Sequence, residues 1–447
     1  MPGPERLTIA PGSTWRNWGR SVRSEPRFVA RAGSADEVAA AVRFAREHGL
    51  PVKPVGAGHS FSPIAATNGV QIDLRWLDGV LDRRELPDGG ALITLGAGTN
   101  LYQLPALLGP LGVALQNMGD IDRQTIAGAT STGTHGTGLA FGGLATQIRA
   151  ATLVTADGEV LRVDEREHAE LLPAVALGIG GLGILVDVTI ECVPAFGVRA
   201  VERRERLEQV LDEWGERTRA SDHFELYTWP HAEWALTKSN TRLAPGEGVT
   251  PLRRGREWFD DAFMANGVYS QLLRLGAIAP VVVPGINRLA ARLASAREFS
   301  DDSQAVFVSP RAFRFREMEY AVPVEAVPEA VREVRAFIDR KGWRISMPIE
   351  VRCAAADELW LSTAHGRASG YIAVHRFAGE RLGGYFREVE PILRAYDGRP
   401  HWGKMHGRTA EDLRPAYPRF DDFLAARDRL DPDRVFANDY LRRVLGP

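Results

Sequence analysis

The feature of this sequence that most constrains its fold is a glycine-rich segment that follows the second strand of a strand–helix–strand unit. Residues 28–31 have the apolar character of a strand, and Ser34 with Glu37 three residues later predicts a capping box at the start of a helix. A second strand over residues 51–55 leads directly into Gly56-Ala57-Gly58-His59-Ser60. A Rossmann dinucleotide-binding unit carries its glycines after the first strand, so this order excludes that fold for the segment.

One stretch, Gly178–Gly183, matches the G-x-G-x-x-G pattern formally, but its context is reversed. A helical pattern precedes it and a strand beginning at Ile184 follows it, whereas a Rossmann fingerprint runs from strand to helix. We therefore interpret it as a tight helix-to-strand turn. The sequence contains no Walker A, H-E-x-x-H or G-x-S-x-G motif, so the usual signals of ATP hydrolysis, zinc proteolysis and serine hydrolysis are absent.

Composition narrows the class of protein further. With 447 residues, the chain is long enough for two or three domains. Its 55 Lys and Arg against 57 Asp and Glu give a formal net charge of −2, which argues against a dedicated nucleic-acid-binding protein. Cys192 and Cys353 are too few for a disulfide scaffold and are expected to be buried thiols in a reducing compartment. Because no signal peptide and no apolar run of membrane-spanning length is apparent, we expect a cytoplasmic protein with at most peripheral membrane contact.

Two stretches of small residues are candidates for ligand loops. In segment 56–60, backbone N–H groups without bulky side chains around them can approach and hydrogen-bond a pyrophosphate. The second stretch, residues 116–138, is dense in Gly, Thr and Ser. Taken alone, it is also compatible with a turn-rich surface loop.

Two further segments carry side chains suited to chemistry. Glu350 and Arg352 lie on a predicted strand, where positions two apart share one face, so both are expected to point into one cavity or to form an internal ion pair. Lys404 is a single cation beside aromatic residues in the segment His401–His406. The two histidines of that segment are five positions apart with no carboxylate between them, so we expect no metal site there or elsewhere in the chain.

Together and in this order, these four segments resemble the FAD-dependent oxidoreductases of the vanillyl-alcohol oxidase type over nearly the whole chain. Within that group the chain is most similar to the sugar-1,4-lactone oxidases and dehydrogenases, which act on L-gulonolactone or D-arabinonolactone, and to the related alditol oxidases. The strongest carriers are Gly56–Ser60, Thr132–Gly136, Glu350-x-Arg352 and His401–Lys404, and the last marks the lactone and alditol oxidase branch.

The resemblance implies an α+β fold with a two-part FAD-binding domain and a cap domain, which is an antiparallel sheet covered by helices. The composition changes near residue 195, after which Arg and Trp become more frequent. The expected boundaries are 1–194 for the FAD-binding domain, 195–409 for the cap or substrate domain, and 410–447 for a C-terminal segment that returns to the FAD-binding domain. Residues 250–300 are expected to pack as an ordinary part of the cap, with a lid or an oligomer contact as the alternatives.

The same resemblance implies FAD as the cofactor and assigns residues to it. His59 would be joined covalently to the 8α carbon of the flavin. The residues expected to bind FAD are Pro54, Val55, Gly56, Ala57, Gly58, His59 and Ser60 around the pyrophosphate, Asp120, Thr125, Gly128, Ala129, Thr130, Ser131 and Thr132 along the flavin, and Ile184 at the nucleotide.

The catalytic residues that the resemblance implies are Glu350, Arg352, Lys404, His375 and Asp120, all facing the substrate cavity. Arginine keeps its proton at working pH, so Arg352 is expected to polarise substrate or flavin rather than to act as a base. Lys404 is expected to stabilise the negative charge that gathers near N1 of reduced flavin. Glu350 would orient the substrate hydroxyl or Arg352, and the group that removes the hydroxyl proton stays open.

Asp120 departs from the family pattern, because alditol oxidases commonly carry Ser at this position. A carboxylate beside the substrate changes hydroxyl recognition, which favours a sugar-1,4-lactone, oxidised by hydride transfer to flavin N5, over an alditol such as xylitol or sorbitol. The electron acceptor would be oxygen or an electron-carrier protein. An alternative of a different class is a flavin-free relative that uses the fold to bind carbohydrate, and the joint presence of His59, Glu350, Arg352 and Lys404 argues against it.

Overall fold

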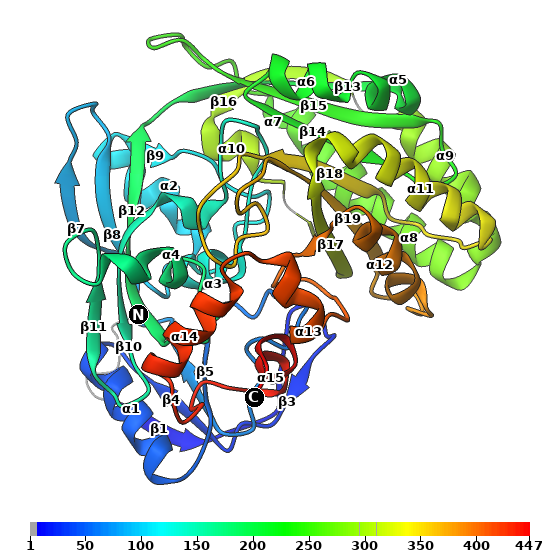
Figure 1. The fold of residues 1–447 in the computed structure, drawn as a ribbon. Helices are drawn as coiled ribbons and strands as arrows, with labels where there is room; N and C mark the ends of the chain where they lie inside the picture. The colour runs from blue at the N-terminus through cyan, green and yellow to red at the C-terminus, as the bar shows by residue number, and fades with distance from the viewer. Residues whose placement is uncertain (1–6, 295, 310) are drawn as a thin grey trace.

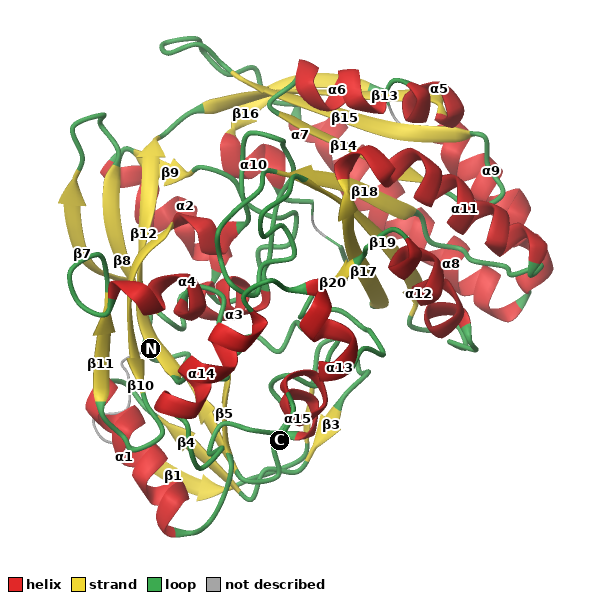
Figure 2. Cartoon of the chain, in the orientation of Figure 1, coloured by secondary structure: helices red, strands yellow, loops and turns green. Residues whose placement is uncertain are grey.

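The structure of the protein is a computed structural model that describes residues 7–294, 296–309 and 311–447. The strands form three sheets, of four, six and eight strands, and a two-stranded ribbon, and helices pack around them (Figure 1). The two smaller sheets occupy the left half of the view, and the eight-stranded sheet with its covering helices occupies the upper right (Figure 2). This arrangement confirms the expected α+β fold, in which an antiparallel cap sheet stands beside an FAD-binding part.

The first sheet is built around the strand–helix–strand unit that the sequence predicts. Its strands are β1 (Thr8–Pro11), β4 (Phe28–Arg31), β5 (Val52–Val55) and β6 (Val70–Asp73), and both β4 and β5 pair with β6 in parallel. Helix α1 (Ala35–Glu47) begins where the capping box predicts. The side chain of Ser34 accepts a hydrogen bond from the Glu37 N–H, and the Glu37 carboxylate accepts one from the Gly33 N–H. The unit places the glycine-rich segment 56–60 directly after β5.

The second sheet is antiparallel and carries the second stretch of small residues. Its strands are β7 (Val80–Glu85), β8 (Ala91–Gly96), β9 (Val113–Leu115), β10 (Ile148–Val154), β11 (Val160–Val163) and β12 (Ile184–Pro194), with the short helices α2 (Leu104–Leu108) and α4 (Leu172–Val175) between them. The centre of stretch 116–138 is helix α3 (Ile126–Thr132), in which Ile126, Ala129 and Thr130 are fully buried. The stretch is therefore not a surface loop.

The third sheet has eight antiparallel strands in the order β16-β13-β15-β14-β18-β19-β17-β20. These strands are β13 (Gly197–Arg206), β14 (His223–Thr228), β15 (Trp234–Arg242), β16 (Arg297–Asp302), β17 (Phe315–Pro323), β18 (Ile349–Ala354), β19 (Ser369–Phe377) and β20 (Arg399–Pro400). One face is covered by α5 (Leu207–Asp212), α6 (Trp214–Ala220), α11 (Val327–Arg340) and α12 (Tyr385–Ala395). The remaining helices of this region are α7 (Arg254–Glu257), a π-helical segment (Trp258–Val268), α8 (Tyr269–Ile278), α9 (Val283–Leu293) and α10 (Ser303–Phe307).

Alternation along the central strands of this sheet separates apolar side chains from ionisable ones. In β18, Ile349, Val351 and Cys353 belong to the hydrophobic core beneath the covering helices, and Glu350 and Arg352 point away from that core into a cavity. The neighbouring strands add further polar side chains to the face of Glu350 and Arg352: Glu225 and Tyr227 from β14, Glu317 and Glu319 from β17, and Tyr371 and His375 from β19. One face of the sheet therefore stabilises the cap, and the other is available for chemistry.

The C-terminal helices return to the N-terminal half of the chain (Figure 1). They are α13 (Ala410–Leu413), α14 (Phe420–Leu430) and α15 (Asp439–Leu445), and their buried residues belong to the same hydrophobic core as the two smaller sheets. The Asn438 amide donates hydrogen bonds to the carbonyls of Pro63, Ile64 and Ala66 at 2.9–3.1 Å. These contacts support the division into 1–194, 195–409 and 410–447, which we propose as the domain organisation.

Cys192 and Cys353 are buried and free, as the sequence predicts. Burial raises the pKa of Cys192 to about 12 and that of Cys353 to about 11, so both remain protonated thiols at neutral pH. No helix in the described residues combines the length and the apolar character that crossing a membrane requires.

The two-faced sheet predicts a large stability effect at Ile349. This side chain is fully buried against the covering helices, so Ile349→Ala should lower the free energy of unfolding by about 2–5 kcal/mol through lost burial and a residual cavity. Leu81→Ala, at a side chain that is 59% exposed, is the control and should change it by less than about 0.5 kcal/mol. Urea unfolding followed by tryptophan fluorescence measures both, and equal losses would contradict the assignment.

Candidate active site

A cavity with about 1000 Å³ of open space lies among the loops of the N-terminal half. It is lined by the end of β5 and the glycine-rich loop, by the start of α3, by the turn 178–183, and by apolar side chains from β10, α4 and β12. The lining residues include Lys53, Pro54, Gly56, Ala57, Gly58, His59, Ser60, Gln124, Thr125, Gly128, Ser131, Thr132, Leu153, Val175, Gly178, Ile179, Gly180, Leu182, Gly183 and Leu185.

Close approach of two loops makes glycine necessary in the floor of this cavity. A Cβ on Gly56 would overlap the hydroxyl oxygen of Thr125. That hydroxyl caps α3 by accepting a hydrogen bond from the Gly128 N–H at 3.3 Å. Gly58 has φ of +65°, a backbone conformation that residues with a side chain adopt only with strain. The floor of the cavity is therefore mostly main chain.

The cavity fits the FAD that the sequence implies. A floor of backbone amides suits a pyrophosphate, and the apolar side chains of Leu153, Val175 and Leu185 suit a purine ring. Lys53 links the wall of the cavity to neighbouring segments, since its ammonium donates hydrogen bonds to the carbonyls of Gly180 and Phe436 at 3.0 and 3.1 Å. Burial lowers the pKa of Lys53 to about 7, partly opposed by Asp431.

A second cavity, with about 670 Å³ of open space, lies under the ionisable face of the eight-stranded sheet. Both cavities are lined by His59, Ser60, Gln124 and Thr132, so they adjoin at these residues. The end of a dinucleotide that lies at these residues would therefore be next to the second cavity.

His59 at this junction is held by the N-terminal ribbon, which consists of β2 (Trp15–Arg16) and β3 (Arg23–Ser24). The ring of Trp18, between the two strands, stacks on the imidazole with centroids 4.8 Å apart. The backbone N–H of Trp18 donates to the Gly58 carbonyl at 2.8 Å. Burial lowers the pKa of His59 to about 4, and Lys404 adds to that effect, so the imidazole is neutral at neutral pH.

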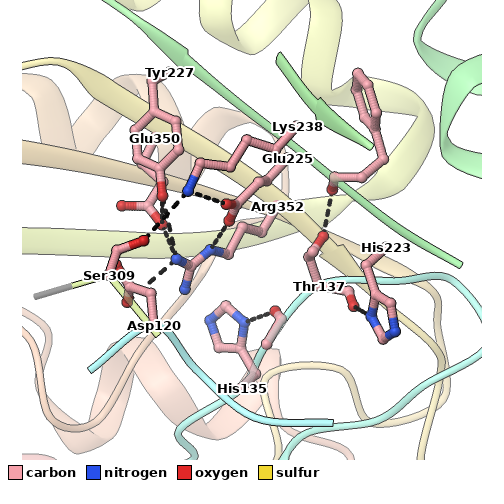
Figure 3. Close-up of polar contacts among 12 residues, drawn as sticks. Asp120, His135, Thr137, His223, Glu225, Tyr227, Lys238, Ser309, Glu350 and Arg352 are labelled. Atoms are coloured by element: carbon pink, nitrogen blue, oxygen red, sulfur yellow. Dashed lines mark hydrogen bonds and ion pairs between the residues drawn. The ribbon is translucent and has the colours of Figure 1, made fainter. Parts of the chain in front are cut away.

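Arg352 is the centre of a buried network of alternating charges in the second cavity (Figure 3). Its guanidinium contacts the carboxylates of Asp120 at 3.2 Å, of Glu225 at 2.9 Å and of Glu350. Arg311 adds a second guanidinium 2.7 Å from Asp120. Because buried charges are tolerated only when they are paired, each of these groups fixes the position of its neighbours.

The carboxyl groups of Asp120 and Glu350 have opposite pKa shifts. Burial raises the pKa of a carboxyl group, but the guanidinium groups of Arg352 and Arg311 outweigh it and hold the pKa of Asp120 well below its usual range. Burial raises the pKa of Glu350 to about 8; Arg352 opposes this rise and Asp120 adds to it. At neutral pH Asp120 is therefore ionised, and Glu350 gains or loses its proton within the working range of most enzymes.

Lys404 belongs to a second charged cluster in the same cavity. Its Nζ lies 2.5 Å from Glu317 Oε2 and 5.4 Å from the centre of the Phe61 ring. Burial alone would lower the pKa of Lys404, but Glu317 and Glu319 outweigh burial and raise it. Lys404 is thus a fixed cation.

His375 has one ring nitrogen free to accept a hydrogen bond. Its Nδ1 lies 2.9 Å from the Pro348 carbonyl, which can only accept, so Nδ1 carries the proton. Nε2 then faces Glu317 at 3.7 Å and Glu350 at 3.9 Å. Burial lowers the pKa of His375, which keeps the imidazole neutral.

His135, Glu319 and His401 bring three potential metal ligands within 4.8 Å of one another. The nitrogens of His401 are already engaged, since Nδ1 accepts from the Gly403 N–H at 3.0 Å and the ring bonds to the Gly133 carbonyl. The cation of Lys404 is also near this group and interacts with both Glu319 and His401. The cluster therefore does not suit a metal ion, and we assign none.

The structure brings most of the sequence-predicted site residues together. Among the predicted cofactor residues, Pro54, Gly56, Ala57, Gly58, His59, Ser60, Thr125, Gly128, Ser131 and Thr132 line the first cavity. Asp120, Glu350, Arg352, His375 and Lys404 line the second. The remaining four, Val55, Ala129, Thr130 and Ile184, are buried behind this lining, between residues that form it.

Several residues that line the cavities were not predicted from the sequence, although most of them belong to a recognisable sequence pattern. The turn 178–183, interpreted as structural only, lines the first cavity. Glu317 with Glu319 and Glu225 with Tyr227 repeat the i, i+2 spacing that identified Glu350 and Arg352. Arg311 lies outside any helix or strand, and no pattern in the sequence marks it.

Comparisons with known proteins agree with this architecture. A family profile described as D-arabinono-1,4-lactone oxidase matches residues 188–444, and one described as an FAD binding domain matches residues 26–164. The chain is 42% identical to an L-gulono-1,4-lactone dehydrogenase from Mycobacterium tuberculosis, with 97% of this chain and 99% of the relative covered. It is 32% identical to an L-gulonolactone oxidase from Bos taurus, with 97% and 98% covered. A crystal structure of cholesterol oxidase from B. sterolicum shares the fold, with a TM-score of 0.82, 18% identity and both chains covered completely.

An FAD-binding domain joined to an antiparallel cap sheet, with the ionisable face of that sheet turned toward the cofactor cavity, defines a flavin-dependent oxidoreductase. More narrowly, the chain belongs to the D-arabinono-1,4-lactone oxidase family.

The main-chain floor of the first cavity predicts that a bulky side chain there excludes FAD. A Cβ on Gly128 meets only the Thr125 hydroxyl, at 3.0 Å, so the rest of a leucine side chain at this position would enter the cavity. We expect Gly128→Leu to lower the FAD content by about tenfold or more, equivalent to about 1.4 kcal/mol of binding. Gly109→Leu, where nothing lies within 4 Å, is the matched control. Absorbance of the purified proteins gives the ratio of FAD to protein, and unchanged content in Gly128→Leu would contradict the assignment.

Proposed function

We propose that this protein oxidises the C2 hydroxyl of an aldono-1,4-lactone of the L-gulono or D-arabinono type, with FAD as the hydride acceptor. The observation that carries the proposal is that the two cavities adjoin: a cavity with fixed cations and carboxylates suited to a polyhydroxylated ring lies next to a cavity suited to FAD. The names of the relatives, L-gulono-1,4-lactone dehydrogenase and L-gulonolactone oxidase, support the same substrate class.

FAD, when bound, supplies the hydride acceptor at N5 of its isoalloxazine ring. The residues that would hold it are those of the glycine-rich loop, the start of α3 and the turn 178–183. We further propose that His59 carries FAD covalently at the 8α carbon. Its position at the junction of the cavities and its neutral imidazole, which has an unprotonated nitrogen, support this link.

Arg352 and Lys404 would supply the fixed positive charge that the reaction needs. Charge that develops on the substrate or the cofactor is stabilised most by groups that are already oriented and partly shielded from water. Arg352 is oriented by its three carboxylate contacts, and Lys404 by Glu317. The raised pKa of Lys404 favours a role as a cation and argues against a role as a base.

Glu350 is the group that we propose takes the proton of the substrate hydroxyl. A general base works best when its pKa is near the working pH, and Glu350 meets that condition. The Tyr227 hydroxyl donates to the Glu350 carboxylate at 3.3 Å and orients it. Asp120, held ionised by Arg311 and Arg352, would accept a hydrogen bond from another substrate hydroxyl.

The proposal includes oxygen or an electron-carrier protein as the final acceptor. It also includes a cytoplasmic location, which the two free, buried thiols support.

The function is tested by anaerobic mixing of the purified protein with a panel of aldono-1,4-lactones and a panel of alditols, while the flavin absorbance band is recorded. We expect L-gulono- or D-arabinono-1,4-lactone to bleach the band and xylitol or sorbitol to leave it unchanged. Bleaching by alditols alone would overturn the substrate assignment, and a protein without a flavin band would overturn the assignment as an oxidoreductase.

The covalent link predicts a simple difference on denaturation. Acid precipitation should leave the flavin with the wild-type protein and release it from His59→Ala, because only a covalent bond survives unfolding. Absorbance of the supernatant measures the released flavin. Complete release from the wild-type protein would show that the link is absent.

The raised pKa of Glu350 predicts the pH dependence of the reaction. The carboxyl group is protonated below about pH 8 and cannot accept a proton, so the rate of flavin reduction should rise with pH through about 8. Glu350→Gln should lower this rate by about 10²–10⁴ and remove the rise. Stopped-flow absorbance under anaerobic conditions measures both.

Glu380→Gln is the control for this experiment, since Glu380 is also a buried carboxylic acid with a raised pKa but lies outside both cavities. It should keep the wild-type pH profile. A Glu350→Gln variant that keeps the rise near pH 8 would assign the proton transfer to another group.

A further inference from the structure

Helices α8 and α9 lie at the margin of the cap (Figure 1), and many of their apolar side chains are exposed. Thirteen large apolar side chains are exposed in the described residues, and nine of them lie between Trp258 and Leu293. Scattered exposed apolar residues are ordinary, but such a concentration marks an interaction site. The α8–α9 surface, as we call it, consists of Leu275, Ile278, Val281, Val282, Leu289 and Leu293 with the exposed Arg274, Arg288 and Arg292.

The inner sides of the two helices fix this surface to the cap. Buried residues on these sides are Leu273 and Gly276 from α8 and Val283, Ile286, Asn287 and Ala291 from α9. The Asn287 amide donates to the carbonyls of Pro230 and Ile345 at 2.9 and 2.7 Å. The helices are therefore anchored by their own buried contacts, as expected of an ordinary part of the cap, and the outer apolar side chains are not needed for that packing.

The outer side is most exposed at the turn between the helices. Ile278 is 83% exposed and Val281 is 79% exposed, and Pro280 between them is also exposed. Arg274, Leu275 and Ile278 follow the helical spacing of one face of α8, and Leu289, Arg292 and Leu293 do the same on α9. The result is an apolar tip between two amphipathic helices.

All the charged residues of this surface are basic. The sequence contains no Asp or Glu from Ala262 to Arg297. The ion pairs of this region, Arg256–Asp260 and Arg297–Asp261, lie outside the surface. Among the described residues, Arg274, Arg288 and Arg292 have no carboxylate partner; Arg274 contacts only the amide oxygen of Gln271, at 3.3 Å.

This charge pattern decides between the occupants of the surface. A symmetric contact with a second copy would bring the arginines of both copies together with no carboxylate from this surface to neutralise them. An apolar tip flanked by cations matches the boundary of an anionic bilayer, where apolar side chains enter the acyl region and Lys or Arg meets lipid phosphates. We propose that the α8–α9 surface docks this protein peripherally on a membrane containing anionic phospholipid.

Docking of this kind would place the membrane on the same side of the molecule as the second cavity. On its inner side, α8 contributes Leu273 to the buried cluster that contains Phe61 and Phe315. Both phenylalanines line the second cavity. The proposal does not depend on the identity of the substrate, because it rests on the outer side of the helices.

The test is flotation of the FAD-loaded, full-length protein with two kinds of vesicle: phosphatidylglycerol mixed equally with phosphatidylcholine, and pure phosphatidylcholine. We expect the wild-type protein to float with the anionic vesicles, and high salt to release most of it. The double variant Ile278→Asp and Val281→Asp should bind at least about tenfold more weakly. Each of Arg274→Gln, Arg288→Gln and Arg292→Gln should weaken binding to the anionic vesicles by about fivefold.

Leu81→Asp, at an apolar side chain on β7 that is 59% exposed, is the control and should bind like the wild type. All variants should keep the wild-type FAD content, which shows that they are folded. Absence of flotation, or flotation that Ile278→Asp with Val281→Asp leaves unchanged, would overturn the proposal. A dimer in solution that this double variant dissociates, without any binding to vesicles, would assign the surface to a second copy.

Discussion

The structure depends on one constraint: the eight-stranded sheet must bury both of its faces, and only one of them is apolar. The face toward α11 and α12 is held by ordinary hydrophobic packing. The other face buries carboxylates and cations, which stay charged inside a protein only when they are paired. Asp120 and Glu225 therefore pair with Arg352, which Glu350 also contacts, and Glu317 pairs with Lys404. The pairing that makes burial of this face tolerable also fixes the side chains in the orientation that a reaction needs.

The cofactor side of the site depends on three separate parts of the chain. The glycine-rich loop can approach α3 only because Gly56 has no side chain. Lys53, at the foot of that loop, donates to the carbonyls of Gly180 in the turn 178–183 and Phe436 in the C-terminal segment. A single buried ammonium thus joins the loop, the turn and the end of the chain, and it adds to the hydrophobic core that holds the last 38 residues against the N-terminal half.

Much of this arrangement could be predicted from the sequence, and the limits have physical reasons. The strand–helix–strand unit and the shared face of Glu350 and Arg352 follow from local periodicity, which a single sequence displays. The assignment of FAD and of the reaction class came from resemblance, since small residues alone fit a surface loop as well as a ligand loop. The roles of Arg311 and of the turn 178–183 depend on contacts between segments that are distant in the sequence, such as Arg311 with Asp120. Local sequence patterns do not reveal such contacts. The i, i+2 pairs on β14 and β17 could have been found by the argument already used for β18.

Because Trp18 stacks on His59, the fluorescence of its indole ring should respond to what occupies the site. An indole 4.8 Å from the residue at the junction of both cavities would lie within a few ångströms of any chromophore that occupies that junction. Its excited state would then decay by energy transfer to that chromophore instead of by emission. The brightness of this one ring, among the ten tryptophans of the chain, would therefore follow occupancy of the site and movement of the N-terminal ribbon, without any label attached to the protein.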